Sequence, residues 1–205
     1  DRGGHHGTFR QQPCQQLPTL QTALTFPRSS YWCGRVPSRA VIGPAPAELS
    51  AAPRVRIAAA CAAHGQDAIA SWAAELLAGV AAYDDPQLPP VTWLGGRHAA
   101  AELRRGPLAE RGQEYWPRVW AARALLYVWV PQAGPAVLRA LADPSWRVRE
   151  MAAKVAKLRE IGEAGDGLAD LVDDSIPRVR VAAVRALGVV GEAEHATAGH
   201  TAIDD

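Results

Sequence analysis

The sequence lacks the features of membrane-spanning, secreted and disulfide-stabilised proteins. No run approaches the roughly 20 consecutive apolar residues that cross a membrane. The N-terminus has no basic segment followed by an apolar one, as a signal peptide would. The three cysteines, Cys14, Cys33 and Cys61, are widely spaced and form no CxxC pair, which is typical of a reduced compartment. We therefore expect a cytoplasmic protein without a membrane segment.

Motifs that carry chemistry are also missing. There is no GxGxxG or P-loop sequence, and no Ser-His-Asp or Cys-His arrangement that a repeat geometry would bring together. His5 and His6 precede Cys14 in a Gly-rich segment, but no ligand set has the closed spacing of a structural zinc site. We expect no catalytic residue, no metal and no cofactor.

Lysine and strand-forming runs are scarce. Lys154 and Lys157 are the only lysines, so the many arginines reflect a compositional habit and are weak evidence of phosphate binding. Residues 1–60 carry seven Arg against two acids, whereas residues 61–205 carry fifteen basic side chains against nineteen acids. An acidic region of this size argues against nucleic-acid binding as its main role.

Internal repeats are the strongest positive signal. The heptapeptide Pro53–Ala59 recurs as Pro177–Ala183, 124 residues later, which is four times 31. Weaker copies are Arg147–Ala153 and, 29 residues earlier, Pro117–Ala122. A fifth copy is expected near residues 84–105, where a Pro/Gly-rich insertion blurs it.

Each copy has the spacing of an amphipathic helix. In the copy that begins at Arg147, Val148, Met151 and Val155 fall at i, i+3 and i+7, and the alanines between them widen the same face. Asp143 and Asp174 precede two of these runs, where an N-cap is expected. Second helices are predicted between the runs, and because no helix pair buries its apolar face alone, the pairs must stack.

We therefore predict an all-α fold, a right-handed α-α superhelix of about five helix pairs. The predicted repeat domain covers residues 51–192. Residues 1–50 contain many Pro, Gly, Gln and Ser and no sustained period, which predicts a disordered or extended segment, and residues 193–205 are predicted to be a flexible tail.

The pattern Asp-Pro-x-x-x-Val-Arg-x-x-Ala-Ala, read from Asp143 to Ala153, resembles the short HEAT-like repeat named after phycobilin lyases. The resemblance extends over roughly Pro53 to Gly191. It implies that the Asp and the Arg that follows Val are similar to ladder residues that tie neighbouring repeats together. The implied ladder residues are Asp143, Arg149, Asp174 and Arg180.

Four tryptophans fall within about one repeat: Trp116, Trp120, Trp129 and Trp146. Aromatic and Arg side chains together are used by protein interfaces and by nucleic-acid stacking surfaces, but they also fill the space between alanine-rich helices. Trp116 and Trp146, at loop-to-helix junctions, are the better candidates for exposure. The predicted partner contacts are Trp116, Arg118, Trp146, Arg147 and Arg178.

The function predicted from these patterns is a non-catalytic protein-interaction scaffold that binds a partner protein or peptide on its concave face. Two enzymatic alternatives stay open. The Trp, Asp and Arg cluster is similar to that of the HEAT-like DNA alkylation repeat glycosylases, and the repeat itself is similar to bilin lyases. The polar sequence after Gly191 predicts that Val184, Leu187 and Val190 lie exposed at the last repeat, where the chain would associate weakly with itself.

Overall fold

The computed structural model describes residues 49–191, all within one compact unit. This part of the chain contains eight α-helices and no strand, which confirms the all-α prediction. Residues 1–48 of the predicted N-terminal segment 1–50 lie outside the described residues, and so does the predicted tail 193–205. The α-helices are α2 (Pro53–His64), α3 (Gln66–Leu77), α4 (Thr92–Arg104), α5 (Tyr115–Ala124), α6 (Gly134–Ala140), α7 (Trp146–Arg159), α8 (Gly165–Asp170) and α9 (Pro177–Val190). Four short 3₁₀ turns connect them: η2 (Ala109–Arg111), η3 (Pro131–Ala133), η4 (Gly162–Ala164) and η5 (Leu171–Asp173).

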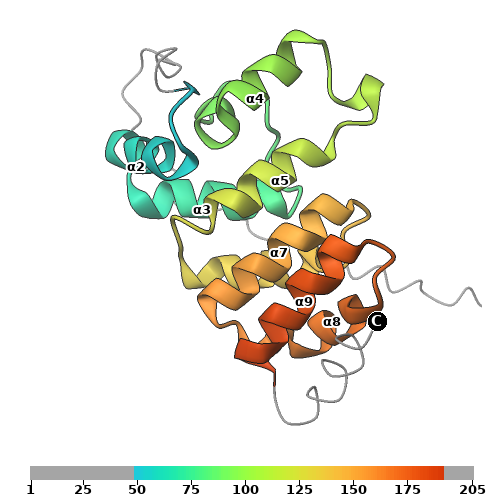
Figure 1. The fold of residues 1–205 in the computed structure, drawn as a ribbon. Coiled ribbons are helices and arrows are strands. Elements are labelled where there is room, and N and C mark those ends of the chain that lie inside the picture. The colour runs from blue at the N-terminus through green and yellow to red at the C-terminus, as the bar shows by residue number, and fades with distance from the viewer. Residues whose placement is uncertain (1–48, 192–205) are drawn as a thin grey trace, which may run out of the picture. The chain divides into compact units, whose positions relative to one another are not determined.

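The helices form a stack of pairs with one irregular step. The first helices α5, α7 and α9 lie side by side, with α7 between the other two (Figure 1). The second helices α6 and α8 pack against α7 and α9 respectively. Towards the N-terminus, α3 packs directly on α5 and α6, and α4 lies between α2 and α5. Only a 3₁₀ turn follows α4 before α5 begins, so the unit predicted near residues 84–105 has one α-helix where its neighbours have two.

Small side chains line the contacts between the first helices. Ala121 and Ala122 of α5, Ala152 of α7 and Ala183 and Ala186 of α9 are completely buried. Alanine allows two helix backbones to approach closely while adding little side-chain entropy cost. The larger buried side chains, Trp72 and Trp120, lie in the N-terminal part of the stack.

The two aspartates predicted as N-caps stand before the capping residues, and each bonds the turn that precedes its helix. Helix α7 begins at Trp146 after the capping residue Ser145, so Pro144 lies outside the helix. The Ser145 N–H donates to Asp143 Oδ1 over 2.8 Å, and the Ile176 N–H donates to Asp174 Oδ1 over the same distance. Each Asp therefore stabilises the turn that leads into the helix.

Gly162 and Gly191 stand in the sequence where a left-handed residue is expected to end a helix, and the structure differs at both. Helix α7 ends in a left-handed residue, as predicted, but that residue is Glu160, with φ of 50°, and not Gly162. Gly191 after α9 is extended. The apolar stripe from Ile69 to Val80 favours a helix as far as Tyr83, but α3 ends at Leu77, because Gly79 takes a positive φ of 70° that a helix does not continue through.

A buried arginine holds the kink in α4. Gly96 has φ of 61° and ψ of −144°, which interrupts the helix. Arg56 of α2, only 3% exposed, donates from Nε to the Trp93 carbonyl and from Nη2 to the Leu94 carbonyl, over 2.9 and 3.0 Å. Its Nη1 donates to the Ala51 carbonyl over 2.8 Å. The guanidinium thus satisfies carbonyls that the kink frees, and burial, together with nearby Arg123, lowers the pKa of Arg56.

Candidate interaction surface

Two equivalent ion pairs join successive repeats. Arg118 of α5 donates from Nε to Asp143 Oδ2 over 2.7 Å, and Arg149 of α7 donates in the same way to Asp174 Oδ2 over 2.7 Å. Both pairs span 25 residues and are separated from each other by 31. The repeat copy at Pro117–Ala122 is therefore offset by 31 residues from the next one, and the alignment with a 29-residue offset, which set Arg118 beside Arg147, is wrong by two residues.

The second pair is almost enclosed. The Asp174 side chain is 5% exposed and that of Arg149 is 17% exposed. Burial alone would raise the pKa of Asp174, but hydrogen bonds from Arg149 and from the Ile176 N–H hold the pKa below its ordinary value. Arg149 Nη1 also donates to the Asp143 carbonyl, so one guanidinium contacts the turns before α7 and α9. Arg180 donates to the Asp174 carbonyl over 2.9 Å.

Four of the five predicted partner contacts lie in one row across α5, α7 and α9. The Arg147 Cζ lies 5.4 Å from the ring centre of Trp116 and 4.4 Å from that of Trp146. The Arg178 Cζ lies 5.6 Å from the ring centre of Trp146. We call Trp116, Arg147, Trp146 and Arg178 the aromatic–arginine row. Its two tryptophans and Arg147 are half-buried, and the Arg178 side chain is 68% exposed.

The other predicted and neighbouring residues lie elsewhere. Arg118, the fifth predicted contact, is held in the ion pair with Asp143 and is 27% exposed. Trp120 is a core residue, 1% exposed, whose Nε1 donates to His98 Nδ1 of α4 over 3.3 Å. Burial is the main cause that lowers the pKa of His98, which keeps that nitrogen available as an acceptor. Trp129 is half-buried beside Arg159, whose Cζ lies 5.4 Å from its ring centre.

A groove of about 550 Å³ runs between α7 and α9, next to the aromatic–arginine row. Its floor contains Glu150, whose side chain is 9% exposed and accepts from Lys154 Nζ over 2.7 Å and from Arg178 Nη2 over 3.1 Å. Lys157 and Arg185 line the groove and make no hydrogen bond or ion pair with residues 49–191. We call this set the basic groove; it comprises Glu150, Lys154, Lys157, Arg178, Val181, Ala182 and Arg185.

The 31-residue register explains why the groove is open at α9. Ala182 on its wall is equivalent to Trp120 of α5, against which α4 packs at Gly95. Arg185 is likewise equivalent to Arg123. On α5 the tryptophan fills the joint and Arg123 is largely enclosed, so burial lowers its pKa. On α9 the alanine leaves space, and the cation faces the groove.

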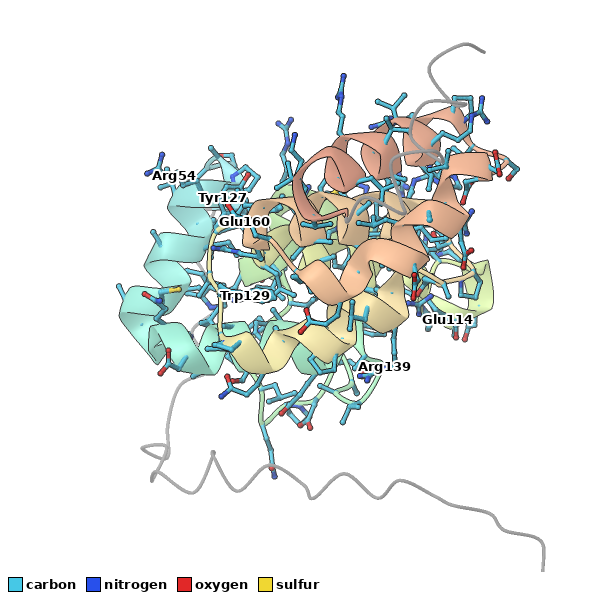
Figure 2. The ribbon with its side chains drawn as sticks, turned by 90° about the horizontal axis from the view of Figure 1, so that it is seen from below. Arg54, Glu114, Tyr127, Trp129, Arg139 and Glu160 are labelled. Carbon is cyan, nitrogen blue, oxygen red and sulfur yellow. The ribbon has the colours of Figure 1, made fainter. Side chains whose placement is uncertain are left out.

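A second hollow, of about 530 Å³, lies between α2 and the end of α5. Arg54 and Tyr127 line it at one edge of the described part (Figure 2). Cys61 also contributes to the lining and is a free thiol, whose pKa is raised by burial. Within residues 49–191 no group of three or more His, Cys, Asp or Glu side chains could hold a metal ion. None of the described helices is long and apolar enough to cross a membrane.

The apolar end predicted at the last repeat is not formed by the expected residues. Leu187 and Val190 are buried and Val184 is half-buried, whereas Val181 and Val189 are the exposed valines of α9. Self-association through this end stays a prediction, and those three residues do not provide an exposed face for it.

The residues that the sequence-based reasoning missed are Glu150, Lys154, Lys157 and Arg185. One signal was available, because the chain's only two lysines stand three residues apart on one helix, on the same face as Glu150. Glu150 also occupies a buried position in the helix where an apolar residue is the rule, which marks it as part of a polar cluster.

The comparisons with known proteins agree with this architecture. Residues 105–188 match the family model of HEAT repeats, which covers α5 to α8 and most of α9. No curated protein and no solved structure matches the chain significantly. The regular helix pairs and their 31-residue register agree with this match, so residues 105–188 are similar to HEAT repeats.

Proposed function

We propose that this protein is a non-catalytic interaction scaffold, which binds a partner protein through the aromatic–arginine row. The observation that carries the proposal is the alternation of Trp116, Arg147, Trp146 and Arg178 across three successive repeats. Tryptophan and arginine are the side chains most often responsible for binding energy at protein interfaces. Stacking holds these side chains in place before binding, which reduces the entropy lost on association.

The position of the row supports binding along a continuous face of the stack. The first helices α5, α7 and α9 pack directly on one another, so a partner segment that runs across them can contact every member of the row. Stacked repeats offer extended surfaces of this kind, and we propose that this face is the concave one. The 31-residue register also supports assignment to the short, phycobilin-lyase-type repeat.

Neither enzymatic alternative gains a supporting observation. The glycosylase resemblance relies on an Asp beside the tryptophans, but the Asp143 carboxylate accepts from both Arg118 and the Ser145 N–H. Such a carboxylate is poorly placed to act as a base. The bilin lyase resemblance rests on the repeat alone. The free thiol of Cys61 is compatible with a reducing, cytoplasmic setting, which we also propose.

Affinity capture tests the proposal. The full chain is immobilised, proteins retained from an extract of its native cells are identified, and each purified candidate is rebound. Trp146→Ala/Arg147→Ala should weaken binding of the true partner by about tenfold or more, because truncation of a binding hot spot costs that much. The melting temperature and helicity of this variant should stay close to those of the parent.

Leu103→Ala/Arg104→Ala is the matched control, because it truncates an adjacent apolar and basic pair that is exposed on α4. Equal loss of binding in both variants would refute the proposal. Unfolding of the Trp146→Ala/Arg147→Ala protein would also refute it, since the row would then belong to the core.

A further inference from the structure

We propose that the basic groove binds an acidic, helical segment of the partner protein, with carboxylates of that segment paired to Lys157 and Arg185. The inference rests on the proposed scaffold function and adds the chemistry of the partner. Arg178 belongs to both the groove and the aromatic–arginine row, so one partner segment can contact both.

The groove has a net positive charge. Four cations, Lys154, Lys157, Arg178 and Arg185, surround a single carboxylate, Glu150. Lys154 and Arg178 already satisfy Glu150, so the two remaining cations face the groove without a partner among the described residues. By contrast, η4, α8 and η5 carry four acids: Glu163, Asp166, Asp170 and Asp173. The positive charge is therefore local to the α7–α9 side, where it attracts a ligand of opposite sign.

The spacing of these cations matches one side of a helical ligand. Lys154 and Lys157 stand at i and i+3 on α7, and Arg178 and Arg185 stand at i and i+7 on α9. Each pair therefore lies on one face of its helix, and the two faces meet at the groove. Val181, 47% exposed, lies between the two arginines and offers an apolar contact. A ligand helix with carboxylates along one edge and small apolar side chains beside them matches this arrangement.

The joint between α4 and α5 shows what an enclosed cation at this repeat position requires. Arg123 of α5, which is equivalent to Arg185 of α9, donates from Nη2 to the Leu94 carbonyl of α4 over 3.5 Å. Arg185 has no such acceptor among residues 49–191, which leaves its guanidinium available to an acceptor on a ligand.

The test uses two labelled helix-forming peptides of the length of α4. One carries glutamates along one face, and the other carries glutamine at the same positions. Fluorescence anisotropy with the full chain should show that the glutamate peptide binds about tenfold or more tightly than the glutamine peptide. The difference should shrink between about 50 mM and about 500 mM NaCl, because salt screens exposed charges.

Lys157→Ala/Arg185→Ala should weaken binding of the glutamate peptide by about tenfold. The melting temperature of the protein should stay unchanged, since both side chains are exposed. Arg104→Ala/Arg139→Ala is the matched control, with the same loss of charge on α4 and α6. Figure 2 shows Arg139 away from α9 in that view. Equal binding of the two peptides, or equal loss in the control variant, would overturn the inference. Tighter binding of a single-stranded DNA of equal charge would also overturn it, because the groove would then be a nucleic-acid surface.

These results separate the inference from the scaffold proposal. If partner capture depends on Trp146 and Arg147 while the glutamate peptide fails to bind, only the acidic ligand is refuted. If the peptide binds through Lys157 and Arg185 but capture ignores the aromatic–arginine row, the proposed use of that row is refuted.

Discussion

The joint between α4 and α5 and the joint between α7 and α9 use equivalent positions in opposite ways. At the first, Gly95 of α4 brings its backbone against the Trp120 ring, and Arg123 is enclosed. At the second, Ala182 replaces the tryptophan and Arg185 faces a groove. A repeat register therefore fixes where a side chain stands, while the volume of its neighbours decides whether it supports the fold or remains available to a ligand.

The largest effect is expected at the closed joint, from Arg56→Met. This change removes the donor to the Trp93, Leu94 and Ala51 carbonyls and keeps most of the apolar volume. The free energy of unfolding should fall by about 3 kcal/mol, because buried acceptors lose their partners. Urea denaturation followed by tryptophan fluorescence measures the loss.

Arg54→Met is the matched control for that experiment, since Arg54 is exposed on the same helix. It should change the free energy of unfolding by less than about 0.5 kcal/mol. If Arg56→Met were as stable as this control, α4 would not depend on Arg56 for its position.

A smaller effect is expected from Gly95→Ala, which tests the close approach directly. A Cβ at Gly95 would meet the Ala99 side chain first and would lie 2.8 Å from Cδ2 of Trp120, both closer than the packed core allows. Overpacking of this kind costs about 1–3 kcal/mol. Thermal unfolding monitored by circular dichroism should show a lower melting temperature.

Gly188→Ala on α9 should instead raise the free energy of unfolding. A Cβ there meets nothing within 4 Å, so the helix gains about 0.5–1 kcal/mol from the loss of glycine flexibility in the unfolded chain. Destabilisation by Gly188→Ala would contradict the open space around this position on α9.

An effect of intermediate size, about 1.5 kcal/mol, is expected from Asp174→Asn at pH 7, because it weakens a charged hydrogen bond with Arg149. The pKa of Asp174 in the folded state is lowered, so its full contribution to the free energy of unfolding is present at pH values above its unfolded pKa of about 4. It is lost as the pH falls through the folded pKa. Urea titrations from neutral to acidic pH should therefore show the parent and the variant converging below about pH 4.

Asp170→Asn removes one exposed carboxylate from α8 and serves as the control. It should differ little from the parent at any pH. A constant difference between Asp174→Asn and the parent down to the lowest pH would contradict a role for the ionised carboxylate.

Helix content and repeat length could be predicted from sequence because they follow from local patterns. The valine and alanine spacing around Val148 and Val179 marks the buried faces of α7 and α9 directly. The third copy was aligned two residues out of register because Pro117 and Arg118 imitate Pro177 and Arg178. The ion pair with Asp143 shows that Arg118 is instead equivalent to Arg149.

The closed joint and the groove depend on contacts between distant residues, which local patterns do not contain. Arg56 shares the repeat position of Arg149, but Ala81 stands where the paired aspartate is expected 25 residues later. Its guanidinium donates to α4 carbonyls instead. A pattern of side chains in the sequence does not show which backbone carbonyls lack a partner within their helix. The groove arises from the small volume of Ala182, which becomes visible only when the neighbouring helix is in place.

The basic groove lies between two repeats, and this location links binding to cooperativity. In a stack of repeats, each unit is stabilised mainly by the interface with its neighbour. A ligand that contacts both α7 and α9 adds its binding free energy to that single interface, and so couples the last described helix more tightly to the rest. Local opening of α9 would then be suppressed in proportion to occupancy, so amide hydrogen exchange in α9 would report the bound state without a change of shape.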